Sequence, residues 1–403
     1  MRLRTVLATV TAGLAAATCL TVGPAAAGTR QDHACSPAVS LDRFSDALDK
    51  TTYRGNYVGN LSALAADRHG DLAALSDRSS LFTLDRRTLR PTGVVRLADE
   101  NGAALDSEAL VVDRDGTRLV TSETEPSVRR YSRAGRILDR LPVPSSLLVA
   151  PAGRATANQT FEGLTLLPDG RTLLASMEYA LAGDAAGIVR FQTWQRTGDG
   201  RFRLGAQYAY RTDDGLGVPE VQATPNGRLL VLERGFTSGV GNTVRLYLAD
   251  PRQATDTAEV DRLTGQSGVR LVEKTPLADI AACPSLGATA KQPQPNPLLD
   301  NIEGMTITGR DTRGDLRVLL VSDDNENPAQ TTRFYHLRVR TDLQGCGLRP
   351  RAGFSGARGR VDMRLRRASA SSPHPPASAH EREDEHTARH ARFTTASRFV
   401  TAG

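Results

Sequence analysis

A hairpin-like segment recurs along this chain of 403 residues. It consists of an acid, a small residue, an apolar run, a turn with Asp-Gly or Asn-Gly, a second apolar run and a second acid. NQTFEGLTLLPDGRTLLASMEYAL, which contains Glu162 and Glu178, is one clear copy. A pattern that repeats at intervals of tens of residues constrains the fold strongly, because each copy must form the same supersecondary unit.

Five copies are present, and their first positions fall at residues 62, 108, 162, 220 and 303. Short alternating apolar runs and Gly-containing turns follow each copy, which is typical of all-β structure. Four antiparallel strands per unit of about 50 residues indicate a β-propeller blade. We count five units, and the long last step leaves room for a sixth blade. The alternative is a β-sandwich in which the hairpins resemble one another by chance.

The last unit ends after TRFYHLRV, one strand short of a full blade. The N-terminal stretch VSLDRFSDALDKTTYRGNYVG can supply the missing outer strand. Pairing the two ends would protect open sheet edges. We therefore predict a propeller whose ring is closed by the N-terminal strand.

In an antiparallel hairpin the start of the first strand lies beside the end of the second. The two acids of each unit should then meet at one end of the blade, and equivalent acids from all units should converge on one mouth. Clustered carboxylates repel and need cations, protonation or hydrogen-bond donors. Oxygen ligands without nearby thiol or imidazole favour Ca²⁺. The alternative is that the acids accept backbone hydrogen bonds or pair with arginines and only hold the ring together.

Nucleophilic hydrolase machinery is not indicated, since the sequence has no Gly-x-Ser-x-Gly motif. A metal-activated water with a carboxylate base fits the available residues better. We predict Glu162, Glu178 and Glu233 as catalytic residues and Arg78, Arg234 and Arg333 as substrate-binding residues. The predicted calcium ligands are Glu108, Glu162, Glu220, Glu303, Asp323, Asp324 and Asn325.

Several of these segments together resemble a known family, the phytase-like domain. They are DSEALVVDRDG, NQTFEGLTLLPDGRTLLASMEYAL, LLVLERGF, LLDNIEGM and LLVSDDNEN, and the resemblance covers about residues 55–340. Glu326 departs from the pattern, because an aromatic residue is expected there. The resemblance implies an exported bacterial protein with a propeller fold and esterase-like activity on an ester or phosphoester. A calcium-dependent lactonase or carboxylesterase, and a non-catalytic binding propeller with structural calcium, are the competing interpretations.

The two ends of the chain differ from the middle. Residues 1–27 have a basic start, an apolar run and a small-residue cleavage site near Ala27, which is typical of a secretory signal peptide. Residues 28–340 form the predicted propeller, and residues 341–403 a predicted disordered basic tail. The positive net charge of the chain comes from these ends. We therefore expect a secreted monomer with a small-molecule substrate, no nucleic-acid partner and no stable membrane insertion.

Three cysteines remain after cleavage, and an exported chain enters an oxidising compartment. Cys35 and Cys283 both fall in the predicted propeller, so we predict a disulfide between them, which leaves Cys346 in the tail. The alternative is that all three are free thiols.

Overall fold

The computed structural model describes residues 30–67, 70–266 and 268–342. The predicted signal peptide, nearly all of the predicted tail, and Cys346 lie outside these residues. The helical elements that it describes are three short 3₁₀ turns, η1 (Arg30–His33), η2 (Ser145–Leu147) and η3 (Ile280–Ala282). In the same part of the chain, no helix has the length and apolar character needed to cross a membrane.

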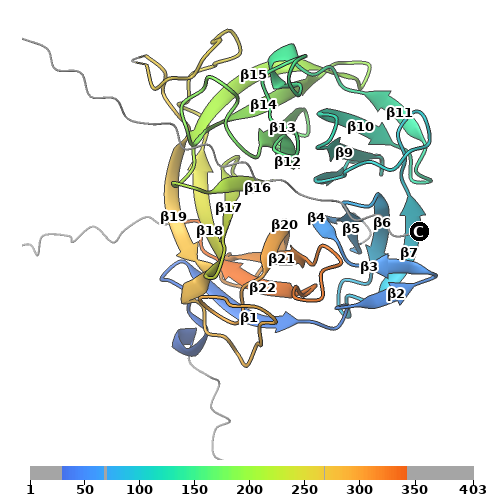
Figure 1. Ribbon diagram of the computed structural model, residues 1–403, viewed down its shortest axis with the longest axis vertical. Helices are drawn as coiled ribbons and strands as arrows, with labels where there is room; N and C mark the ends of the chain where they lie inside the picture. The colour runs from blue at the N-terminus through green and yellow to red at the C-terminus, as the bar shows by residue number, and fades with distance from the viewer. Residues whose placement is uncertain (1–29, 68–69, 267, 343–403) are drawn as a thin grey trace, which may run out of the picture. The chain divides into compact units, whose positions relative to one another are not determined.

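Five four-stranded antiparallel sheets, which we call blades 1 to 5, are arranged in a ring (Figure 1). Blade 1 comprises β4 (Leu61–Ala66), β5 (Leu72–Ser76), β6 (Ser80–Leu84) and β7 (Pro91–Arg96). Blade 2 comprises β8 (Leu110–Val112), β9 (Arg118–Ser122), β10 (Ser127–Tyr131) and β11 (Ile137–Arg140). Blade 3 comprises β12 (Phe161–Leu166), β13 (Thr172–Met177), β14 (Ile188–Arg196) and β15 (Phe202–Arg211). Blade 4 comprises β16 (Gly217–Ala223), β17 (Leu229–Thr237), β18 (Gly241–Asp250) and β19 (Glu273–Asp279).

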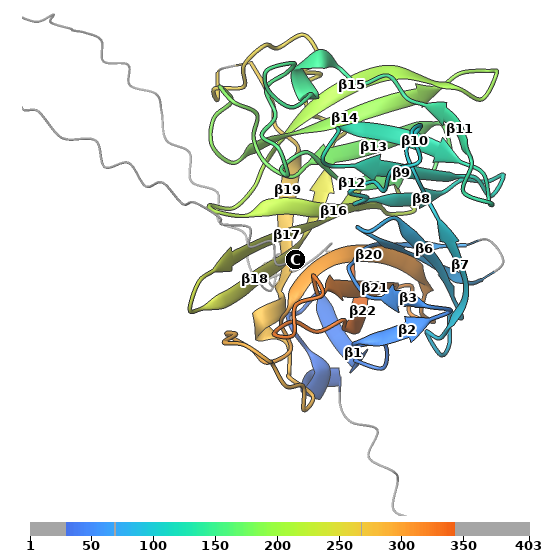
Figure 2. The same cartoon turned by 45° about the vertical axis from the view of Figure 1, so that its right-hand side comes forward.

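Blade 5 closes the ring. Its inner three strands are β20 (Asn301–Arg310), β21 (Leu316–Asp323) and β22 (Phe334–Val339), and its outer strand is β1 (Val39–Ser45). β1 pairs antiparallel with β22, and Figures 1 and 2 both show the two strands side by side. The predicted all-β propeller with an N-terminal closing strand is thus confirmed, and the described residues contain five blades rather than six. A separate two-stranded hairpin, β2 (Thr51–Tyr53) with β3 (Asn56–Val58), follows β1.

The apolar core is divided among the junctions between neighbouring blades. Phe82 of blade 1 clusters with Phe334 of blade 5, and Trp194 of blade 3 clusters with residues of blade 2. The remaining three junctions each hold a similar cluster of buried aliphatic and aromatic side chains. Because burial of apolar area stabilises each junction, the blades support one another around the whole ring.

A disulfide joins Cys35, just before β1, to Cys283, just after η3. These are the two cysteines that the sequence analysis paired. The bond links the closing segment of the ring to the end of blade 4, across 248 residues of sequence.

Candidate active site

β-bulges in the innermost strands of three blades contain residues that reach the mouth of the ring. A bulge inserts one extra residue into a strand and re-aims its side chain. The ladder between the two innermost strands shifts register between Leu61 and Ala63 in blade 1 and between Ile302 and Gly304 in blade 5. The shift in blade 3 falls in the equivalent place, between Phe161 and Leu164. The bulges of these three blades therefore contain Ser62, Glu303 and Glu162, respectively.

The second strand of each blade supplies another residue at the same end. Asp323, the last residue of β21, pairs with Asn301 just on the mouth side of the bulge. Asp77, Glu123 and Glu178 each follow directly after the second strand of blades 1, 2 and 3. Acids from four blades thereby converge, as the repeat predicts.

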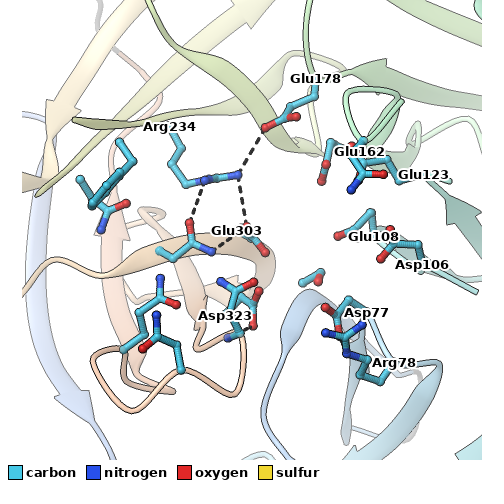
Figure 3. A pocket seen from close by; sticks show the side chains of 18 of the residues that line it. Asp77, Arg78, Asp106, Glu108, Glu123, Glu162, Glu178, Arg234, Glu303 and Asp323 are labelled. Carbon is cyan, nitrogen blue, oxygen red and sulfur yellow. Dashed lines mark hydrogen bonds and ion pairs between the residues drawn. The ribbon is translucent and has the colours of Figure 1, made fainter. Parts of the chain in front are cut away.

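The converging side chains line a pocket of about 570 Å³ at the mouth (Figure 3). We call this pocket the acid mouth. Its wall carries eight carboxylates and two guanidinium groups, together with several amide side chains. The charged residues are Asp77, Arg78, Asp106, Glu108, Glu123, Glu162, Glu178, Arg234, Glu303 and Asp323.

Among the described residues, Arg234 is the one buried cation that lines the acid mouth. It pairs with Gly217 of β16 on the mouth side of the bulge, and so takes in blade 4 the place that Asp323 takes in blade 5. Its Nη2 lies 3.3 Å from Oε1 of Glu178 and 3.2 Å from Oε1 of Glu303. Its Nη1 donates to Oδ1 of Asn301 at 2.7 Å. Figure 3 shows the contacts of Arg234 with Glu178 and Glu303 as dashed lines. Arg234 thus neutralises acids of two neighbouring blades.

Burial raises the pKa of the carboxyl groups in the acid mouth. Desolvation raises the pKa of Asp77 to about 7, against the opposing effect of Arg78. Desolvation and the charge of Asp106 raise the pKa of Glu123 to about 7. Desolvation also raises the pKa of Glu178 to about 8, although Arg234 opposes it. These groups change charge near neutral pH.

The remaining buried acids show the same direction. Desolvation, and then the charges of neighbouring carboxylates, raise the pKa values of Glu108, Glu162 and Asp323 well above the ordinary range. Burial also raises the pKa of Glu303, which Arg234 and Asn301 partly offset. The acid mouth therefore favours bound protons or a bound cation over free negative charge.

Two groups of three carboxylates have oxygens within 4.8 Å of one another. One group is Asp106, Glu108 and Glu123, and the other is Glu123, Glu162 and Glu178. Glu123 belongs to both groups and lies within hydrogen-bonding reach of Glu162. Such close, mostly buried carboxylate oxygens fit a hard divalent cation such as Ca²⁺.

Two predicted site residues of blade 4, Glu220 and Glu233, do not line the acid mouth. The bulge of this blade lies between Gly217 and Glu220, one residue earlier than the acid pattern implies. Glu220 is fully buried, and its Oε1 accepts N–H bonds from Val221 at 2.8 Å and from Leu164 at 3.3 Å. It is therefore a cap that joins blades 3 and 4, and its prediction as a metal ligand is corrected.

Glu233 is also fully buried, in a separate network. It accepts hydrogen bonds from the Tyr210 hydroxyl at 2.6 Å, from the Asp213 N–H at 2.7 Å and from Lys274 Nζ at 2.7 Å. All its oxygens are engaged away from the mouth. Its prediction as a catalytic residue is therefore corrected to a structural role.

Two predictions in blade 5 are also corrected. Asp324 accepts hydrogen bonds from Lys50, from the Tyr57 hydroxyl and from the Asn60 N–H, so it anchors the β2–β3 segment instead of binding a metal. Arg333 is buried and donates to both oxygens of Asp46, at 2.7 and 2.8 Å, and to three backbone carbonyls. Its guanidinium is saturated within the protein, which leaves it unsuited to substrate binding.

The other predicted residues do line the acid mouth. They are Arg78, Glu108, Glu162, Glu178, Arg234, Glu303, Asp323 and Asn325. The predicted lists omitted Glu123 and Asp106, which the two close carboxylate groups include. Glu123 occupies the same place in its unit as Glu178, so the repeat itself indicates that Glu123 lies at the mouth. Asn301 and Phe236, which also line the mouth, have no such signal in the repeat.

The fold and the acid mouth define a five-bladed propeller with a carboxylate-rich site at one end of its ring. The chain belongs to the phytase-like family, described as esterase-like activity of phytase, whose model matches residues 56–326.

Individual relatives are more distant. An uncharacterized secreted protein of Arthroderma benhamiae is 29% identical where the two align, over 23% of each protein, so this chain matches about a quarter of that relative's length. A gluconolactonase from Xanthomonas campestris is 15% identical, with 70% of this chain and 73% of that chain covered and a TM-score of 0.36. Glutaminyl cyclase from Myxococcus xanthus is 13% identical, with 76% and 99% covered and a TM-score of 0.39. At these TM-scores, neither solved structure indicates a shared site.

Proposed function

We propose that this chain is a secreted, calcium-dependent hydrolase of an ester or phosphoester, with its site in the acid mouth. The convergence of eight carboxylates from four blades on one pocket carries this proposal. Membership of a family described by esterase-like activity supports the reaction class. The signal-like residues 1–27, the Cys35–Cys283 disulfide and the secreted relative support an extracellular location.

The two close carboxylate groups suit the metal. Asp106, Glu108 and Glu123 form one close group and would hold the ion together with Glu162, which lies within hydrogen-bonding reach of Glu123. Burial raises the pKa of Glu108, Glu123 and Glu162, which disfavours free negative charge on these three groups. When bound, calcium would neutralise an anionic substrate and lower the pKa of a coordinated water.

Glu178 is the best-placed candidate for a general base. Its pKa of about 8 is close to a working pH near neutrality, where a base accepts protons most effectively. Arg234 contacts its Oε1 and so orients the carboxylate. The buried Nε of Arg234 donates no hydrogen bond among the described residues.

One observation favours a neutral ester or lactone over a phosphoester as the substrate. Eight carboxylates face only two guanidinium groups in the pocket, so phosphate would be repelled unless bound cations reverse the charge. Phe236 also lines the pocket and is 57% exposed, which offers an apolar surface beside the acids. A calcium-dependent carboxylesterase or lactonase is therefore the second candidate.

Calorimetric titration of Ca²⁺ into the chelator-treated full chain tests the metal site. Micromolar or tighter binding is expected, followed by calcium-dependent hydrolysis of p-nitrophenyl acetate, a lactone or p-nitrophenyl phosphate. Glu162→Gln should abolish calcium-dependent turnover and weaken calcium binding, while Glu273→Gln, an exposed acid on β19, should change neither.

The outcomes separate the competing interpretations. Calcium binding without turnover on any of these substrates would indicate a non-catalytic binding propeller. No binding up to millimolar calcium would show that the acids are structural, and the proposed metal-dependent hydrolase would be wrong.

A further inference from the structure

A second pocket, of about 730 Å³, lies between blades 5 and 1 at the strand ends opposite the acid mouth. The acid mouth takes Asn301 from the start of β20 and Asp323 from the end of β21. The second pocket instead takes Thr308 from late in β20 and Arg317 from early in β21. We call it the arginine pocket, because its lining includes Arg43, Arg86, Arg87, Arg317, Arg338 and His336.

Strand pairing in blade 5 places two arginines opposite one another in the arginine pocket. Arg317 of β21 lies directly opposite Arg338 of β22. In the next row on the same face, Arg43 of β1 lies opposite His336 of β22. Like charges directly opposite on neighbouring strands, as in the Arg317–Arg338 pair, destabilise a sheet. A bound anion would relieve this repulsion.

Few acids offset the arginines. Asp42 is the one acid among the described residues that lines the pocket, and it accepts a hydrogen bond from Arg338 Nε at 2.8 Å. In the described part of the chain, Arg43, Arg87 and Arg317 have no carboxylate oxygen within 4.0 Å of their guanidinium nitrogens. These three side chains are exposed, so their charged ends are available to a ligand.

A nearby acid, Asp85, is engaged by its own turn. Its Oδ1 accepts hydrogen bonds from the N–H groups of Arg87 and Thr88 and from the Thr88 hydroxyl. Arg86 is held at the rim of the pocket by a hydrogen bond to the Thr308 carbonyl. The loop after β6 therefore presents two arginines toward blade 5 in a defined place.

His336 adds a neutral imidazole to the lining of the pocket. Burial, and then the charge of Arg43, lower its pKa to about 4. At neutral pH the imidazole is therefore uncharged and can donate a hydrogen bond through one N–H. Leu72 and Leu319 supply an apolar floor beside it.

We propose that the arginine pocket binds a multiply charged phosphate-type oxyanion, at a site separate from the acid mouth. Guanidinium groups bind such oxyanions through paired N–H donors, and several unpaired guanidiniums around one pocket match a ligand with more than one negative charge. This site does not depend on the proposed hydrolase activity, because none of its residues lines the acid mouth.

Binding of tripolyphosphate to the full chain tests the proposal, measured by calorimetry with a chelator present so that calcium takes no part. The test variant is Arg43→Gln/Arg317→Gln. The matched control is Arg203→Gln/Arg211→Gln, two exposed arginines on β15 of blade 3. The control has the same change in net charge and keeps the same basic C-terminal sequence.

We expect one tripolyphosphate per chain, at least tenfold weaker binding in the test variant and less than twofold weaker binding in the control. Glu162→Gln, in the acid mouth, should bind it as tightly as the wild type. A phosphate-bearing polymer presents the same chemistry, so long-chain polyphosphate serves as a second probe and should show the same ranking of variants. Equal weakening in test and control variants, or no binding at millimolar concentration, would overturn the proposal.

Thermal melting supplies a readout that does not depend on calorimetry. Without ligand, Arg317→Gln should melt at or above the wild-type temperature, because it removes a like charge opposite Arg338. Tripolyphosphate should raise the melting temperature of the wild type and of the control variant, but not that of the test variant. A clear loss of melting temperature in Arg317→Gln without ligand would show that the arginine is structural and would contradict the proposal.

Discussion

Arg234 acts as a built-in counter-cation for the acid mouth, and its removal gives the most informative prediction. Arg234 Nη2 lies 3.3 Å from a Glu178 oxygen and 3.2 Å from a Glu303 oxygen. At an effective dielectric of 20, each such contact corresponds to roughly 5 kcal/mol of attraction before desolvation is subtracted. Removal of one partner of a buried ion pair typically costs about 3–5 kcal/mol. Arg234→Gln should therefore destabilise the calcium-free protein by about that amount where the acids are ionised.

The destabilisation caused by Arg234→Gln should depend on pH, since the pKa of Glu178 is about 8. At pH 5.5 Glu178 is protonated, so loss of the Arg234 guanidinium leaves no unpaired negative charge on Glu178. At pH 8.5 it is mostly ionised, and loss of Arg234 leaves it beside the other buried carboxylates. Calorimetric melting of chelator-treated protein should show a decrease of roughly 6–10 °C at pH 8.5 for Arg234→Gln, at about 2 °C per kcal/mol for a fold of this size. A much smaller decrease is expected at pH 5.5.

Calcium should reverse the defect. Arg234→Gln removes a positive charge beside Glu178, which adjoins the acids proposed to hold the ion, so the acid mouth should bind Ca²⁺ more tightly than in the wild type. Saturating calcium should then restore most of the lost melting temperature. Arg203→Gln, on the outer strand of blade 3, serves as the control and should show neither effect. An equal loss of melting temperature at both pH values, without recovery in calcium, would refute the counter-cation role and indicate that Arg234 acts only through packing.

Three further predictions test other parts of the fold and site. The folded-state pKa values of Asp77, Glu123 and Glu178 are raised to about 7, 7 and 8, so the stability that their protonated forms contribute is fully present below about pH 4 and is lost as the pH rises through 7–8. The melting temperature of the calcium-free protein should therefore fall between pH 5.5 and pH 8.5, and a melting temperature that does not change with pH would contradict this. Glu220→Gln should leave stability within about 1 kcal/mol and calcium affinity unchanged, because burial raises the pKa of Glu220 and a neutral amide keeps its acceptor oxygen, whereas Glu220→Ala should cost about 1–3 kcal/mol in denaturant titrations. Reduction of the Cys35–Cys283 disulfide, which closes a loop across 248 residues, should lower the free energy of unfolding by about 3–5 kcal/mol, and an unchanged denaturation midpoint in reductant would argue against that contribution.

The architecture could be predicted from the sequence because a propeller repeats its local rules. The spacing of turns and apolar runs marked all five inner hairpins, and the incomplete last unit indicated that β1 would pair with β22. The blade number stayed open between five and six, since the step of 83 residues before the last unit gave no clue to its content. In the structure, these 83 residues form the long strands of blade 4 and an irregular segment around η3, and the described residues of this stretch form no additional sheet.

The sequence repeat could not predict side-chain contacts between residues that lie far apart in the chain. Arg333 follows the mouth segment closely, yet its carboxylate partner is Asp46, 287 residues away. Asp324 stands next to Asp323, but its oxygens meet Lys50 and Tyr57 from the segment after β1. Because successive residues leave a strand on opposite sides, neighbouring acids in the sequence need not share a site.

Blade 4 shows most clearly how a site can differ from the pattern that predicts it. PEVQATPNGRLLVLER repeats the two acids of the other units, but its bulge falls before Glu220 instead of at it. A shift of one residue moves a strand's side chains to the opposite face. Glu220 and Glu233 therefore turn into the protein, and Arg234 takes the position at the mouth. Among the described residues, blade 4 is the one blade that gives no carboxylate to the acid mouth, and it supplies Arg234 instead. The change of register that makes the sequence pattern fail in this blade therefore provides the positive charge that offsets the carboxylates of the neighbouring blades.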